Sequence, residues 1–331
     1  MLPPNFTVAI RTFNAAERLP TLLDKLRSQQ HPPSIRWEVL IVDNNSTDNT
    51  VEIVQKYQAE WLSGCELRYV LELQQGAAIA RKRAIQEARG TLIGFLDDDT
   101  LPALDWVAKA YEFGQAYPRA GAYGSRILPD YEIEPPPNFD RIAHYLPTML
   151  RKKSFRYDSH RQGMPVGAGL VIRRQVWLGH AVGAQIIQGP VGRSLMLKGE
   201  EIEALWKIKS AKWEIWYNAE MSIVHKIPQW RLEKAYLLNF LKVIGLSQHR
   251  FRMLRYQVWQ RPFVFPLLLF NDLQKIASHK LKHRNSHDFI TTCELQFFIG
   301  RLCSPFYIWA HLLSQKSDRR YRHSSFTRTG L

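Results

Sequence analysis

Short runs of almost wholly apolar residues recur through the first hundred positions, and they constrain the fold more than any other feature. Two of them, WEVLIVD at 37–43 and TLIGFLD at 91–97, lack the polar and apolar alternation of a half-exposed strand. Strands of this kind are covered on both faces, as in parallel sheets. Segments with apolar residues at helical spacing separate them, so we expect an α/β fold with a mainly parallel sheet flanked by helices.

The same patterns place the elements in order along the chain. Strands are expected at 6–13, 37–43, 67–73 and 91–97, helices at 14–29 and 50–62, and a third helix from Gly76 that Gly90 closes as a C-cap. A proline-rich linker at 132–140 precedes a strand and turn at 164–177, a helix at 195–211 and a strand at 213–225. We therefore expect one domain over 1–230, with halves 1–130 and 131–230, and a tail of amphipathic helices over 231–331.

This tail carries most of the net charge of +15. Residues 231–331 hold 17 Lys and Arg and 5 Asp and Glu, which gives 17 − 5 = +12. Aromatic and aliphatic clusters at 258–270 and 294–313 lie among these cations. Basic charge beside Trp, Phe and Leu is typical of a surface that binds anionic lipid, which is the interpretation we favour. Core helices with solubilising charge are one alternative, and a nucleic-acid surface is another, although no nucleic-acid recognition motif is found.

Three features bear on the compartment. The sequence has no run of eighteen apolar residues that would predict a transmembrane helix, and its first residues lack the pattern of a signal peptide. Cys65, Cys293 and Cys303 are scattered and without zinc-site spacing, which suits a reducing environment. We expect a cytoplasmic protein, peripheral on the inner face of the cytoplasmic membrane.

Polar motifs follow the four strands expected in the first hundred residues. They are Arg11-Thr12-Phe13-Asn14, the segment from Asp43 to Asp48, the segment from Gly76 to Arg81, and Asp97-Asp98-Asp99. Ligands of open α/β sheets bind outside the carboxyl ends of the strands. The four motifs are therefore expected to line one crevice.

The three consecutive aspartates predict a divalent cation site. Carboxylates held together at a strand end repel one another unless a cation neutralises them, and Mg²⁺ or Mn²⁺ prefers such oxygen ligands. A metal there would stabilise the charge that develops on a departing nucleoside diphosphate. The alternative is a solvated acidic turn in which Asp99 or Thr100 caps a helix.

Other candidates have two interpretations each. Asp43 either accepts hydrogen bonds from a base or ribose, or begins an Asx turn in DNNSTD. Arg81 either reaches donor phosphates or lies on a solvated helix face, and neither GxGxxG nor GxxxxGK[ST] is present. Gly167 and Gly169 either let an acceptor approach the backbone or form a tight turn.

Several blocks of the chain together resemble the inverting family 2 glycosyltransferases, which have the GT-A fold. The donor-side blocks are VAIRTFNAAERLPTLLDKLRSQ, VLIVDNNSTDNT, QGAAIARKRAIQEARG and LIGFLDDDTLPALDWV. The blocks GAGLVIRRQVW, LMLKGEEIEAL and VHKIPQWR are similar to the acceptor side of the family. The resemblance runs from about residue 6 to residue 231, excludes the tail, and is nearest to single-addition bacterial polysaccharide enzymes, in particular the cyanobacterial hormogonium polysaccharide group.

The resemblance implies a role for each matching residue. Asp43 would contact the donor base, with Arg11, Thr12 and Asn14 around it. Asp97 and Asp99 would form the DxD pair, in which Asp99 lies nearest the metal and Asp97 or Asp98 lies near the ribose. His225 would lie beside the diphosphate and the metal. Gly199-Glu200-Glu201 stands where the family has Gly-Glu-Asp, so Glu201 is the expected general base and Glu200 the alternative. The longer glutamate puts the geometry of proton removal in doubt.

The implied activity is transfer of a sugar from a nucleotide-sugar to a glycan or lipid-linked acceptor, and a UDP-sugar is the donor we expect. A sugar nucleotidyltransferase would need a glycine-rich GxGxR-like loop, which IRTFNAAER lacks. A catalytically silent nucleotide-sugar-binding protein of the same fold is the other alternative.

Overall fold

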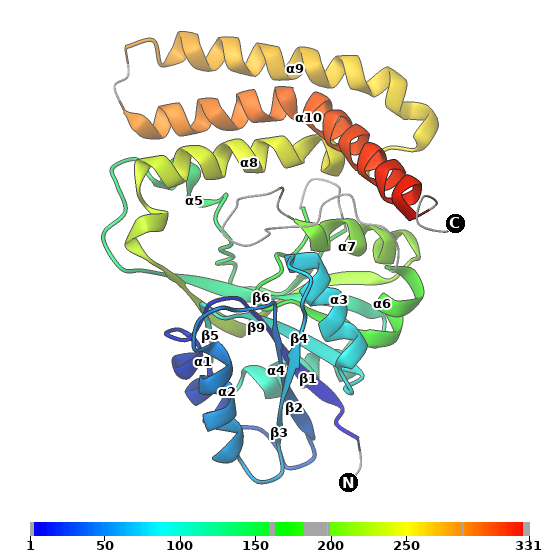
Figure 1. The fold of residues 1–331 in the computed structure, drawn as a ribbon. Coiled ribbons are helices and arrows are strands. Elements are labelled where there is room, and N and C mark those ends of the chain that lie inside the picture. Colours follow the sequence, from blue (N-terminus) through cyan, green and yellow to red (C-terminus); the bar gives the residue numbers. More distant parts are fainter. Residues whose placement is uncertain (1–2, 159–162, 182–196, 198, 286–287, 327–331) are drawn as a thin grey trace. The chain divides into compact units, whose positions relative to one another are not determined.

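A mixed sheet of nine strands forms the centre of residues 1–233 in the computed structural model (Figure 1), which describes residues 3–158, 163–181, 197, 199–285 and 288–326. The strand order is β3-β2-β1-β4-β8-β6-β9-β5, and β7 pairs with β9. The strands are β1 Phe6–Thr12, β2 Trp37–Asp43, β3 Glu66–Leu71, β4 Leu92–Asp97, β5 Thr100–Pro102, β6 Ala120–Tyr131, β7 Phe155–Arg156, β8 Val171–Arg173 and β9 Glu214–Ile227. The first four pair in parallel, and β6 pairs in parallel with β9. The expected fold class, a mainly parallel sheet flanked by helices, is confirmed.

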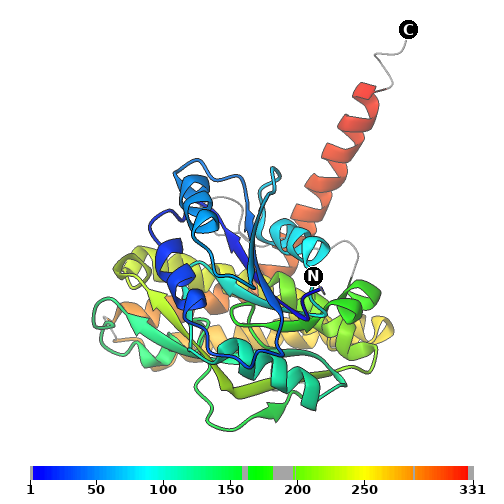
Figure 2. The same cartoon turned by 90° about the horizontal axis from the view of Figure 1, so that it is seen from below.

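Helices cover both faces of this sheet, as Figure 2 shows for α1 and α2 on one side and α3 on the other. The helices of this unit are α1 Leu19–Arg27, α2 Thr50–Ala59, α3 Ala77–Glu87, α4 Trp106–Ala116, α5 Asp140–Ala143, α6 Arg174–His180, α7 Glu200–Ser210 and the short 3₁₀ helix η1 Gln229–Arg231. Alternate residues of each central strand enter different cores. Val8 and Ile10 of β1 pack in one core with Leu22, whereas Ala9 packs in the other with Ala84 of α3. This division explains why the central strands read as continuous apolar runs.

Two expected elements differ from the structure. Gly90 does not close a helix, because α3 ends at Glu87 and Ala88 is its C-cap. A Cβ atom at Gly90 would lie only 2.6 Å from the backbone nitrogen of Thr7, so this glycine is needed where the chain passes close to β1. The strand expected at 164–177 is also shorter, because α6 begins within it at Arg174 and buries Val176 and Trp177 beside the helix α7.

The second half of the expected domain extends the same sheet. Both 1–130 and 131–230 belong to the unit of residues 1–233, and the final expected strand at 213–225 is β9, which continues to Ile227. The described part of the helix expected at 195–211 is α7, which begins after Gly199 in a left-handed conformation with φ 95°. Residues 195, 196 and 198 of that expectation lie outside the described residues.

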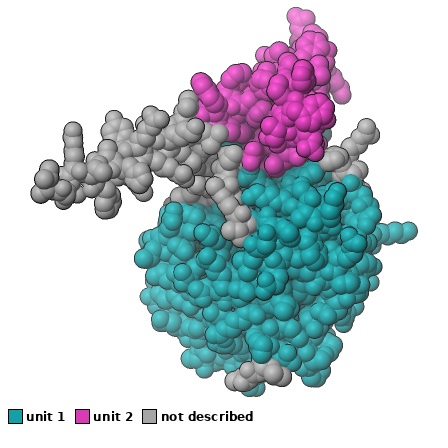
Figure 3. All heavy atoms as spheres, turned by 90° about the vertical axis from the view of Figure 1, so that its right-hand side faces the viewer, with its two compact units in different colours: residues 1–233 teal, residues 234–331 magenta. Residues whose placement is uncertain are grey.

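Residues 234–331 form a second compact unit (Figure 3), and its described residues are mostly helical. Its elements are α8 Lys234–Met253, the 3₁₀ helix η2 Val258–Gln260, α9 Arg261–Lys282 and α10 Phe289–Phe326. One fully buried carboxylate joins the three long helices: Asp272 of α9 accepts hydrogen bonds from Arg252 of α8 at 2.8 and 3.0 Å and lies 2.8 Å from Arg301 of α10. A buried carboxylate held by two guanidinium groups keeps its charge compensated, so Asp272 fixes how these helices pack within the unit.

Among the described residues, no helix is both long enough and apolar enough to cross a bilayer.

Candidate active site

The sheet register brings the expected motifs to one edge. In the parallel ladder Arg11 of β1 pairs with Asp97 of β4, and Thr12 pairs with Asp43 of β2. On the far side, Thr100 of β5 pairs with His225 of β9, so His225 lies next to Asp99. Residues far apart in the sequence thus converge because four strands end at the same level.

Asp99 lies between two side chains from the C-terminal end of this unit. Arg231 donates from Nη2 to Asp99 Oδ2 at 2.7 Å, and His225 Nε2 lies 3.5 Å from the same oxygen. Burial alone would raise the pKa of the Asp99 carboxyl, but the hydrogen bond from His225 and the charge of Arg231 hold this pKa well below its usual range. Asp99 is therefore an ionised carboxylate at neutral pH.

His225 has a nitrogen with unused bonding capacity. Its Nε2 lies 3.0 Å from Nη1 of Arg231, while its Nδ1 is buried and has no hydrogen-bond partner among the described residues. Carboxylate oxygens and an imidazole nitrogen are a ligand set that Mn²⁺ accepts, but the ligand atoms of Asp97, Asp99 and His225 do not all lie within 4.8 Å of one another in this structure. Arg231 lies in the same place, so a cation at Asp99 has to share this carboxylate with the guanidinium or displace it.

Asp98 is held by hydrogen bonds to the first strand and the residues after it. It accepts a hydrogen bond from the Thr12 hydroxyl at 3.0 Å and two from the guanidinium of Arg18, at 2.9 and 3.2 Å. Burial, more than any other influence, raises the pKa of Asp98. Arg18 was not expected from the sequence; its bidentate contact makes Asp98 a structural partner of the loop after β1.

Arg11 joins the aspartates to the acidic pair of α7. Its Nη2 donates to Asp97 Oδ1 at 2.8 Å and its Nη1 to Glu200 Oε1 at 3.1 Å. The side chains of Arg11 and Glu200 are 12% and 7% exposed, so their ion pair is largely shielded from water, whereas Asp97 is 36% exposed. The strand-end aspartates and the Gly199-Glu200-Glu201 block, about a hundred residues apart in the sequence, therefore belong to one site.

Arg81 is buried beneath the same pair of glutamates. It is 2% exposed, which rules out a solvated helix face, and its Nη2 donates to Glu200 Oε1 at 3.2 Å. Its guanidinium lies over the ring of Phe95, 4.8 Å from the centroid. The Nε and Nη1 groups are buried without a hydrogen-bond partner among the described residues. These two donors could be satisfied by an anionic oxygen of a ligand.

The two glutamates are in opposite electrostatic states. Burial would raise the pKa of Glu200, but the positive charges of Arg81 and Arg11 lower it below its usual range. Burial raises the pKa of Glu201 to about 7, and the negative charge of Glu200 adds to this rise. Glu200 is thus the ionised partner of two arginines, whereas Glu201 has the proton affinity that a general base needs near neutral pH.

Asp43 and Asn14 form a hydrogen-bonded turn at the end of β2. Asp43 Oδ1 accepts from the amide and hydroxyl of Ser46, at 2.9 and 2.6 Å, and its Oδ2 accepts from the Tyr69 hydroxyl at 2.7 Å. Asn14, in a left-handed conformation with φ 49°, accepts from the amide of Thr47 at 2.8 Å. The Asx turn that was one interpretation of Asp43 is present, with Oδ1 bound within the turn and Oδ2 bound to Tyr69 of the neighbouring strand β3.

The two glycines before β8 lie in different surroundings. A Cβ atom at Gly167 would lie 2.6 Å from Arg81 Nη2 and 3.5 Å from the carboxyl carbon of Glu201, so this position borders the acidic pair. Gly169, with φ 66°, packs against Ser125, whose hydroxyl donates to the Gly169 carbonyl at 2.6 Å. Gly167 is therefore needed where the chain passes close to Arg81 and Glu201, and Gly169 where it packs against Ser125.

Comparison with known proteins finds similar sequences among glycosyltransferases. The sequence model described as Glycosyl transferase family 2 matches residues 7–177. The glycosyltransferase AglE of Haloferax volcanii is 34% identical over 106 residues, which is 32% of this chain and 34% of that protein. The putative teichuronic acid biosynthesis glycosyltransferase TuaG of Bacillus subtilis is 34% identical over 110 residues, 33% of this chain and 42% of that one. The chain thus matches less than half of the length of these relatives.

Solved structures share the fold at low sequence identity. The mannosyltransferase PcManGT of Pyrobaculum calidifontis, in complex with GDP-Man and Mn²⁺, superposes with a TM-score of 0.56 at 19% identity and covers 91% of this chain and 87% of that one. S. aureus TarS 1–349, in complex with UDP-GlcNAc, gives a TM-score of 0.51 at 16% identity, with 90% and 91% covered. The GT-A fold is confirmed, while the narrower cyanobacterial group stays a prediction.

Proposed function

Since this chain belongs to glycosyl transferase family 2, we propose that it transfers a sugar from a nucleotide-sugar to a hydroxyl of a saccharide acceptor, with inversion at the anomeric carbon. The observation that carries the proposal is the double ion pair of Arg11, which holds Asp97 and Glu200 on opposite sides of one guanidinium. A donor-side carboxylate and Glu200, the neighbour of the proposed base Glu201, are thereby joined through one side chain, which supports a site for a single displacement.

Glu201 is the general base of this proposal. It lies close to Gly167, and its raised pKa would allow it to accept the proton of an acceptor hydroxyl as the new glycosidic bond forms. A single base on the face opposite the leaving group is what an inverting displacement needs. Glu200, held by Arg11 and Arg81, keeps the negative charge that raises the pKa of Glu201.

The leaving diphosphate belongs on the side of the aspartates. Asp99, Asp97 and His225 would hold Mn²⁺ or Mg²⁺, which neutralises charge on the diphosphate. The buried unpaired N–H groups of Arg81 would donate to an anionic donor oxygen. Thr12, Asn14 and Asp43 would contact the nucleoside, with Asp98 near the ribose. To bind the base, Asp43 would give up part of its hydrogen bonding within the turn. PcManGT and TarS, with GDP-Man and UDP-GlcNAc, indicate the class of donor without choosing the nucleotide.

A donor screen tests the proposal. The purified chain is incubated with UDP- and GDP-sugars and Mn²⁺, and release of the nucleoside diphosphate and transfer to added saccharides are followed by mass spectrometry. One donor is expected to be consumed in a metal-dependent way. Metal-dependent binding of UDP or GDP without hydrolysis or transfer of any donor would instead indicate a silent nucleotide-sugar-binding protein.

The pH dependence of turnover follows from the acidic pair. A base must be unprotonated to accept a proton, so kcat/KM is expected to rise with pH through about 7 and to level off above it. In Glu200→Gln the negative charge that raises the pKa of Glu201 is absent, so the rising limb should move to lower pH. Steady-state kinetics of both proteins check this. A limb at the same pH in the variant would show that Glu201 is not the titrating group.

The helical unit is proposed to bind an anionic membrane surface, at the inner face of the cytoplasmic membrane. Trp259, Phe263, Leu267 and Phe270 follow helical spacing and are between 61% and 70% exposed. Exposed Lys275, Lys280, Lys282 and Arg284 lie in the same helix and just after it. Apolar side chains that enter the headgroup region, together with cations that attract anionic lipid, favour peripheral binding.

Liposome flotation checks the membrane proposal. Binding to anionic liposomes at low salt is expected, with weaker binding at high salt or to neutral lipid. The double variant Phe263→Ser/Leu267→Ser should bind at least about tenfold more weakly, because it removes two apolar side chains that would enter the lipid headgroup region. Leu73→Ser is the matched control, since Leu73 is 71% exposed but belongs to the other unit. Equal flotation of wild type and double variant, or none at all, would contradict the proposal.

A further inference from the structure

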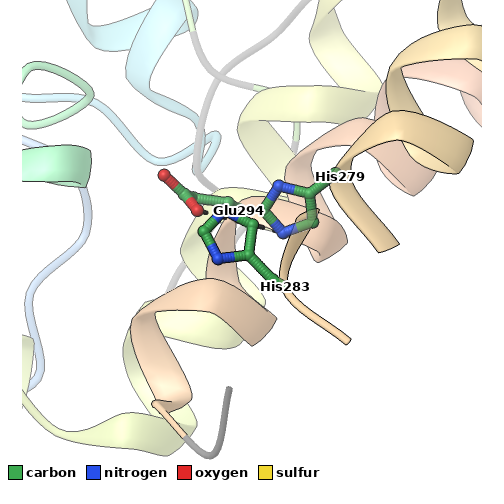
Figure 4. A group of neighbouring side chains, drawn as sticks. All are labelled: His279, His283 and Glu294. Carbon is green, nitrogen blue, oxygen red and sulfur yellow. Dashed lines mark ion pairs between the residues drawn. The ribbon is translucent and has the colours of Figure 1, made fainter. Parts of the chain in front are cut away.

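The end of α9 and the start of α10 bring two histidines and a glutamate together (Figure 4). They are His279, His283 and Glu294, and one potential ligand atom of each lies within 4.8 Å of those of the other two. The group belongs to the helical unit, and none of its members has a part in the transfer reaction proposed above. No metal-binding motif in the sequence indicates this group, because Glu294 comes from the next helix.

The two histidines share one helix face because they are four residues apart. The amide of His283 donates to the His279 carbonyl at 3.0 Å, so the helical turn continues through this first residue after α9. Their rings lie 4.7 Å apart between centroids. Spacing of this kind is what lets two imidazoles bind the same ion from one helix.

Residues of α10 fix the orientation of His279. Its Nε2 lies 3.0 Å from the carbonyl oxygen of Thr291 and 3.9 Å from Oε2 of Glu294. The ring also packs edge-on against Phe298, 5.4 Å between centroids. The side chains of His279 and Glu294 are 9% and 18% exposed, so the group is shielded while still reachable from solvent. An ion bound through Nδ1 of His279 would leave the contact between Nε2 and the Thr291 carbonyl in place, as backbone carbonyls commonly orient metal-binding histidines, whereas an ion bound through Nε2 would replace this contact.

We propose that His279, His283 and Glu294 bind a divalent transition metal ion of the zinc class, which ties the end of α9 to the start of α10. Two imidazoles and a carboxylate suit Zn²⁺ and disfavour Mg²⁺, which requires oxygen ligands. Three protein ligands leave a fourth tetrahedral position for water. Ligand atoms around tetrahedral Zn²⁺ lie about 3.4 Å apart, so rotation of the side chains has to draw the group together by roughly 1.4 Å.

Titration of the full-length chain, freed of metal and of any histidine tag, tests this site. The Asp99→Asn background excludes binding at the aspartates of the other unit. Calorimetry should find one equivalent of Zn²⁺, and Co²⁺ should give the visible absorption of a tetrahedral site. His283→Gln and Glu294→Gln should weaken binding at least about 100-fold. His180→Gln is the matched control, since it removes an exposed imidazole elsewhere and should bind like its parent.

Hydrogen exchange gives a second measure that does not depend on turnover. Zn²⁺ should slow exchange of backbone amides in the last turn of α9 and the first turns of α10 in the parent, and not in Glu294→Gln, whose shape is unchanged. The proposal would be overturned if the parent did not bind Zn²⁺, or if the parent and both ligand variants bound it with equal affinity. It would also be overturned if Zn²⁺ did not change the hydrogen exchange of these amides. The proposed sugar transfer does not depend on any of these outcomes, because the aspartates and Glu201 lie in the other unit.

Discussion

Glu201→Gln is expected to lower kcat by about 10²–10⁴-fold, which is the usual contribution of a general base. The amide has nearly the shape of the carboxylate but cannot accept the acceptor proton. Because Glu201 is proposed to contact the acceptor and not the donor, the KM for the donor should change little. Steady-state kinetics with the donor found in the screen, over a range of donor and acceptor concentrations, separates these two effects.

Glu200→Gln provides the comparison that decides between the two glutamates. This variant weakens ion pairs with Arg11 and Arg81 but keeps Glu201, so its loss of kcat at a pH well above 7 should be the smaller one. Thermal unfolding of both variants shows whether either change acts through stability. A larger loss in Glu200→Gln than in Glu201→Gln, with both folded, would exchange the roles assigned to these residues.

Asp99→Asn is expected to reduce kcat/KM by at least about 10²-fold and to raise the Mn²⁺ concentration needed for half-maximal rate. Asp99 is an ionised carboxylate at neutral pH, and an amide in its place removes the negative charge that a cation would bind. Donor turnover as a function of added Mn²⁺ measures both effects. Turnover that persists in excess chelator would mean that this carboxylate serves another purpose.

Asp130→Asn is the matched control for this variant. Asp130 lies on β6, pairs with Lys226 next to His225 in the sequence, and is 46% exposed at its side chain. It loses the same charge near the same strand but is not part of the Asp99 cluster. Equal losses of turnover in the two variants would assign the effect of Asp99→Asn to general electrostatics rather than to a metal ligand.

The fold could be predicted because its signals are local. Apolar runs such as 37–43 and 91–97 specify strands covered on both faces, and the helices between them follow from periodicity. The prediction failed where packing over distance decided the outcome. Gly90 resembles a helix C-cap in the sequence, yet its conformation is set by β1, which is distant in the chain.

The aspartates, Glu201, Arg11 and Arg81 could be named as candidates because they stand in recognisable blocks, whereas the arginine partners Arg18 and Arg231 could not. Arg18 and Arg231 lie 80 and 132 residues from the aspartates that they bind. Their roles depend on the parallel pairing of β1 with β4 and on β9 returning beside β5. Arg231 stands in the segment VHKIPQWR, six residues after His225. This short separation was the one sequence feature that could have suggested a place for Arg231 near Asp99.

The close approach of Gly90 to Thr7 lies at the opposite end of β1 and β4 from the candidate site. Arg11 and Asp97 are register partners in β1 and β4, and Gly90 precedes β4 where the backbone meets Thr7. Any side chain at position 90 would wedge these two strands apart at a point about 13 Å from Arg11, since Thr7 lies four residues away along the strand. A random mutagenesis screen scored only by turnover would therefore recover substitutions there, remote from every substrate atom, alongside those in the carboxylates themselves.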